Sequence, residues 1–68
     1  MKIEYCLHDA TPAIIVDPDD GRLLGFEYYN GRWEKHSAAE ISHEAVLITE
    51  LAFKKMFPGI GLPKDINS

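Results

Sequence analysis

The sequence contains a single cysteine, Cys6, and no long uninterrupted apolar run. A disulfide within the chain is therefore excluded, which fits a reducing compartment. No stretch approaches the roughly 20 apolar residues that a membrane span needs. Residues 1–10 also lack the apolar segment that follows the basic residue of a secretory signal. We therefore expect a soluble, cytoplasmic protein that has no membrane partner.

Basic residues are also few. The chain has seven Lys and Arg and eleven Asp and Glu, which gives a formal net charge of −4. Nucleic-acid binding draws on clustered cations, and Lys54-Lys55 is the one adjacent basic pair. This balance disfavours nucleic acid as a partner. The sequence also lacks the glycine-rich motifs that bind phosphates and dinucleotides. We expect neither a cofactor nor catalytic residues.

The chain is short, at 68 residues, and 46% of them are hydrophobic. That hydrophobic fraction indicates a folded domain. A domain of this size buries only about 60% of its unfolded surface. Below roughly 70–80 residues, disulfides, a metal or oligomerisation often supply the missing stability. We interpret residues 1–57 as one domain and residues 58–68 as an irregular tail.

Alternation of apolar and polar residues predicts a strand over residues 2–8, and the apolar run at 13–16 predicts a strand covered on both faces. The acidic stretch DPDDGR, residues 17–22, follows this run and leads into the next predicted strand, residues 22–29. A calcium loop of the EF-hand type needs glycine at its sixth position, and counting from Asp17 puts Arg22 there. The stretch is therefore interpreted as a turn.

The pair Asn30-Gly31 is a strong signal for a two-residue hairpin loop. Such a loop pairs Tyr29 with Arg32, and Tyr28 with Trp33. It joins the strand at 22–29 to a fourth strand that ends near residue 36. Residues 2–36 thus predict an antiparallel meander of four short strands.

Ser37-Ala38-Ala39-Glu40 matches the capping box that opens a helix. Helix is predicted from about 38 to 57, where Pro58-Gly59 stops it. The predicted fold is α+β: the meander of residues 2–36, followed by one long C-terminal helix packed on one sheet face.

This fold leaves more apolar surface than one helix covers. The predicted helix is apolar nearly all round. If DPDDGR closes a four-residue loop, Val16 pairs with Leu23, and Ile14, Val16 and Tyr29 lie on the face opposite the helix. Two explanations stay open. Either the tail folds back over this face, or a second copy or another protein covers it.

The sequence therefore favours a small non-catalytic module for protein–protein interaction or regulation, associating as a homodimer. Its size suits a bacterial or phage accessory protein. The partner-binding residues are expected to be Ile14, Val16, Tyr29, Arg32, Ile60 and Leu62. The dimer interface is expected to use Leu47, Leu51 and Phe53 of the predicted helix.

The alternative is a small metal-binding protein or enzyme, with a site formed at a dimer interface by His36, Glu40 and His43. Glu40 and His43 are three residues apart and share a helix face, and imidazole with carboxylate is a ligand set that zinc uses. Two observations weigh against it: Glu40 already serves the capping box, and the order HExxH is absent. No motif in the chain identifies a family.

Overall fold

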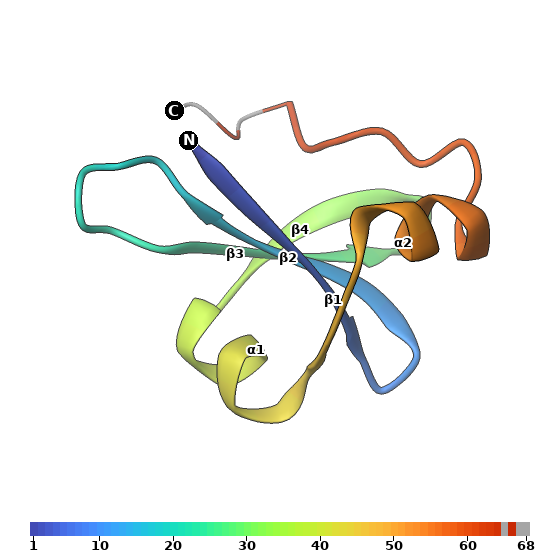
Figure 1. Cartoon of the computed structure of the whole chain (residues 1–68), viewed down its shortest axis with the longest axis horizontal. Coiled ribbons are helices and arrows are strands. Elements are labelled where there is room, and N and C mark those ends of the chain that lie inside the picture. Colours follow the sequence, from blue (N-terminus) through green and yellow to red (C-terminus); the bar gives the residue numbers. More distant parts are fainter. Residues whose placement is uncertain (65, 67–68) are drawn as a thin grey trace.

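The computed structural model of the chain describes residues 1–64 and 66. These residues form one five-stranded antiparallel sheet with the strand order β4-β3-β2-β1-β5, accompanied by two short helices (Figure 1). The elements are β1 (Lys2–His8), β2 (Thr11–Asp17), β3 (Leu24–Tyr29), β4 (Arg32–His36), α1 (Ala38–Glu44), β5 (Val46–Ile48) and α2 (Glu50–Met56). The chain is α+β, but the prediction of four strands and one long helix is wrong.

The segment predicted as one helix is two helices of seven residues with a strand between them. The first helix begins as predicted, since the Ser37 hydroxyl accepts a hydrogen bond from the amide of Glu40. At Ala45 the backbone becomes extended, and β5 pairs with β1 through Leu47 opposite Cys6. Val and Ile in β5 favour strand because their branched side chains fit a pleated surface. Thr49 then caps α2.

The second and third hairpin loops of the meander differ in how well the sequence predicted them. The loop at Asn30-Gly31 is as predicted, with Tyr29 opposite Arg32 and both loop residues at positive φ. In the acidic loop, however, Val16 pairs with Leu24, one residue beyond the predicted partner. A one-residue slip moves every side chain of a strand to the other face of the sheet.

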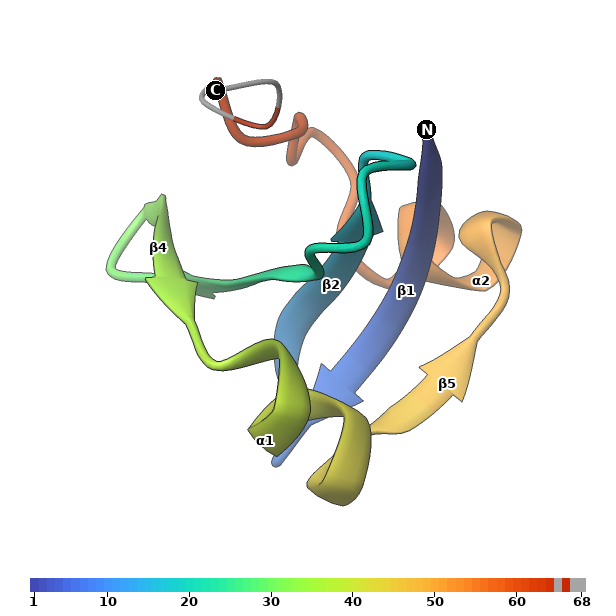
Figure 2. The same ribbon diagram turned by 90° about the vertical axis from the view of Figure 1, so that its left-hand side faces the viewer.

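The sheet has a hydrophobic core on each face, and the two helices lie on opposite sides (Figure 2). On the α1 face, Ile41 of the helix packs with side chains from β1 and β2, namely Cys6, Ala13 and Ile15. On the α2 face the buried residues are Ile14, Val16, Phe26 and Ile66. Phe53 of α2 completes this core, with its ring 5.0 Å from that of Tyr5.

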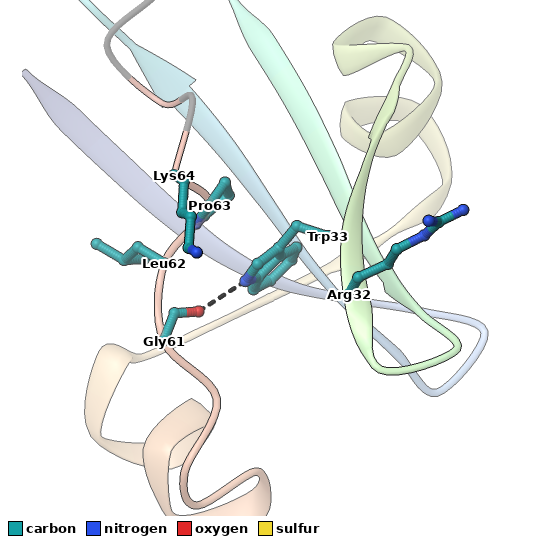
Figure 3. A pocket seen from close by; sticks show the side chains of 6 residues that line it. All are labelled: Arg32, Trp33, Gly61, Leu62, Pro63 and Lys64. Carbon is teal, nitrogen blue, oxygen red and sulfur yellow. Dashed lines mark hydrogen bonds between the residues drawn. The ribbon is translucent and has the colours of Figure 1, made fainter.

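Beyond α2, the tail runs back across the α2 face and has no helix or strand among its described residues. The indole Nε1–H of Trp33 donates a hydrogen bond to the carbonyl oxygen of Gly61 at 2.6 Å (Figure 3). Pro63 and Ile66 are buried, whereas Leu62 is 46% exposed. The tail therefore folds back over this face of the sheet, with Pro63 and Ile66 as its buried side chains.

Candidate functional site

The α1 face carries a group of polar side chains beside its hydrophobic core. Glu27 projects from the middle of β3, while His8 and His36 are the last residues of β1 and β4. Glu40 and Glu44 are four residues apart on α1, and therefore share one side of the helix. We call these five residues the His–Glu cluster.

The His8 ring lies at the centre of the cluster. Its Nδ1 is hydrogen-bonded to the Glu27 carboxylate, and its Nε2 lies 2.8 Å from Oε1 of Glu44. The His36 ring is 5.7 Å from the His8 ring between centroids, and its Nε2 lies 3.3 Å from Oε2 of Glu40. The side chains of His8 and Glu27 are only 11% and 9% exposed.

These contacts set the charge of His8. Hydrogen bonds to Glu27 and Glu44 raise the pKa of His8 to about 9, against a smaller opposing effect of burial. The protonated ring lies against the Glu27 carboxylate, whose side chain is only 9% exposed. Glu34, which lies opposite Glu27 on β4, accepts a hydrogen bond from Nε of Arg32 at 3.2 Å.

The stability of the protein without metal is expected to fall as the pH rises. A folded-state pKa of about 9 for His8, above the usual value of 6.5, means that the folded state holds this proton more tightly. The stabilisation of the folded state by this proton is complete below pH 6.5 and is lost as the pH rises through 9. Urea unfolding in the presence of a chelator, at pH 6, 8 and 9.5, measures the decline.

The matched control for this pH series is His43→Ala, because His43 is exposed and lies outside the His–Glu cluster. It should leave the pH dependence unchanged, whereas Glu44→Gln should reduce it. An unfolding midpoint that stays constant from pH 6 to 9.5 would contradict the assignment of His8 as the protonated bridge.

The cluster includes two of the three residues in the predicted metal site, His36 and Glu40. The carboxylate of Glu40 lies against His36, so the capping box does not prevent this contact. His43 is exposed, and in its place the structure brings in His8 and Glu27 from the same chain. The hairpin register held a signal for this: Gly25 opposite His36 puts Glu27 diagonally next to that histidine.

The residues predicted for binding surfaces fall into two groups. Ile14 and Val16 are 0% exposed and Phe53 is 3% exposed, so all three belong to the core of this chain.

The other predicted residues lie wholly or partly at the surface. Tyr29 and Arg32 are exposed on the hairpin, and Leu62 and the half-buried Ile60 are in the tail. Leu47 and Leu51, predicted for the dimer interface, are 63% and 66% exposed.

A second candidate site lies along the edge of the sheet at β5. Val46 and Leu47 of this strand and Leu51 of α2 are among the most exposed large apolar residues. Leu47 borders two hollows, one of about 120 Å³ that also involves Cys6 and Ile41, and one of about 270 Å³. We call Val46, Leu47 and Leu51 the β5 edge surface.

Comparison of the chain with protein families, curated proteins and solved structures gave no match. Within residues 1–64 and 66, neither helix has the length and apolar character to cross a bilayer.

Proposed function

We propose that this chain is a small interaction module that associates with a second copy of itself through the β5 edge surface. The observation that carries this proposal is the strand Val46–Ile48, which forms one edge of the sheet and contains only apolar residues. An edge strand presents unpaired backbone groups that template pairing with another chain. Natural proteins usually protect such an edge with charge or proline, and β5 has neither.

The opposite edge of the sheet supports a two-fold arrangement. β4 carries Arg32, Glu34 and Lys35, so pairing of β4 with β5 would desolvate several charges. Two β5 strands pair more favourably, since an antiparallel pair centred on Leu47 places Val46 opposite Ile48 of the second copy. Closed two-fold contacts of this kind are the commonest way in which soluble proteins associate.

Acidic residues beside β5 do not oppose this pairing. Glu50 begins α2 and Glu44 ends α1, and the pairing brings these two positions of different copies close together. Each already has a cation within its own chain: Lys54 lies 2.8 Å from Glu50, and His8 lies 2.8 Å from Glu44. These contacts offset much of the repulsion between the carboxylates.

The test is the particle mass in solution, measured by light scattering from micromolar to millimolar protein. The unsubstituted chain is expected to be a dimer, and Leu47→Lys a monomer, because the lysine would bury a charge at the centre of the interface. Leu23→Lys is the matched control, since Leu23 is 55% exposed and lies outside the edge. It should remain a dimer.

Two results would count against the proposal. One is a monomer across the whole concentration range. The other is a dimer that survives Leu47→Lys as well as Leu23→Lys, because the contact would then lie elsewhere on the molecule.

A further inference from the structure

We propose that His8, Glu27 and His36 bind a divalent transition-metal ion, with zinc as the best fit, within a single chain. Their ligand atoms are His8 Nδ1, a Glu27 carboxylate oxygen and His36 Nε2, and all lie within 4.8 Å of one another. Two ligands at ~2.1 Å from zinc, in tetrahedral geometry, are ~3.4 Å apart. Small side-chain rotations would therefore close these three groups around an ion.

The ring nitrogen of His36 is the first observation that points to a ligand. Its Nε2 is shielded from solvent and makes no hydrogen bond with any described residue. Two carboxylates are near it, with Oε2 of Glu40 at 3.3 Å and Oε2 of Glu27 at 3.9 Å, yet neither is placed to bond. A buried polar atom without a partner is unfavourable, and a bond to a metal ion would satisfy this nitrogen.

Glu44 is the second observation, because it occupies the place of an outer-sphere residue. Histidines that bind a metal through one ring nitrogen almost always donate the other N–H to a carboxylate, carbonyl or water. Here Nε2 of His8 lies 2.8 Å from Oε1 of Glu44, which leaves Nδ1 directed at Glu27. The contact with Glu44 would fix the ring orientation and the tautomer that binding through Nδ1 needs.

The composition of the cluster selects the class of ion. Three carboxylates surround two imidazoles, so the site attracts a cation. Imidazole nitrogens suit zinc and other first-row transition metals, whereas magnesium and calcium prefer oxygen ligands throughout. Glu40 lies beside His36, with its Oε2 3.3 Å from Nε2 and its side chain 49% exposed, but it is outside the group of three whose ligand atoms lie within 4.8 Å of one another.

Zinc binding by the full chain, purified without a histidine tag, tests this proposal. Equilibrium dialysis against Zn²⁺ should give one ion per chain. His36→Ala should lower the affinity by more than the ~10–100-fold that loss of an outer-sphere partner causes. Glu44→Gln should lower the zinc affinity by a factor within that range. His43→Ala is the matched control, because it removes the exposed histidine of the same segment, and its affinity should change less than twofold.

A second measurement needs no variant. In a zinc titration followed by NMR, the ring proton signals of His8 and His36 should shift together and saturate at one equivalent, while those of His43 stay in place. This result identifies the ligands even if His36→Ala fails to fold. The proposal is overturned if no stoichiometric binding occurs, if His43→Ala weakens binding as much as His36→Ala, or if only the His43 signals move.

Discussion

Gly25→Ala should destabilise the protein by about 3 kcal/mol, the upper part of the range measured for overpacked sites. A β-carbon at position 25 would lie 2.6 Å from the carbonyl oxygen of His36, and 2.8 Å from the amide nitrogen of Ala38. Both are backbone atoms, so they cannot rotate away. A domain of this length has roughly 3–10 kcal/mol of stability in total. The substitution therefore removes a large share of it.

Gly61→Ala is the control for this substitution, because a β-carbon at Gly61 meets no atom within 4 Å. It should leave stability unchanged or raise it slightly, by restricting the unfolded chain. Urea unfolding followed by circular dichroism compares the two variants. Equal stability of both would show that the junction between β4 and α1 yields to accommodate a side chain at position 25.

Ile66→Ala is expected to destabilise the protein by about 2–4 kcal/mol, even though the residue lies near the end of the chain. Ile66 is only 6% exposed and packs with Ile14, Val16 and Phe26. Its truncation would remove apolar contacts and leave a cavity over the centre of the sheet. The same urea titration measures the loss of free energy.

Leu62→Ala separates packing by Ile66 from a general effect of the tail. Leu62 belongs to the same segment but is 46% exposed, so its truncation should change stability by less than about 0.5 kcal/mol. A loss for Ile66→Ala no greater than that for Leu62→Ala would mean that the tail does not contribute to the core on the α2 face.

Local signals in the sequence predicted the local structure well. Asn30-Gly31 fixed the register of its hairpin, and Ser37 marked the start of a helix, because both depend on a few neighbouring residues. The error over residues 38–57 came from extending one helix from the start signal at Ser37 to the stop signal at Pro58-Gly59. Val46 and Ile48 favour strand, and the decisive factor was the free edge of β1 that their strand pairs with.

The candidate sites were harder to predict because they depend on long-range register. A slip of one residue at Val16 exchanged the two faces of β2, and so Ile14 and Val16 were predicted on a surface. The metal alternative identified His36 and Glu40 because they are near each other in sequence. His8 joins them only through the β1–β2–β3 order of the sheet, which no local pattern contains.

The central strand β2 belongs to both hydrophobic cores, and the two cores should therefore unfold together. Ala13 and Ile15 face α1, while Ile14 and Val16 face the tail and α2. Loss of either layer would leave half of the strand's side chains in water, so neither layer is stable for long without the other. The amide hydrogens of β2 should therefore exchange with solvent only when the whole domain opens, and those of the short edge strand β5 should exchange much sooner.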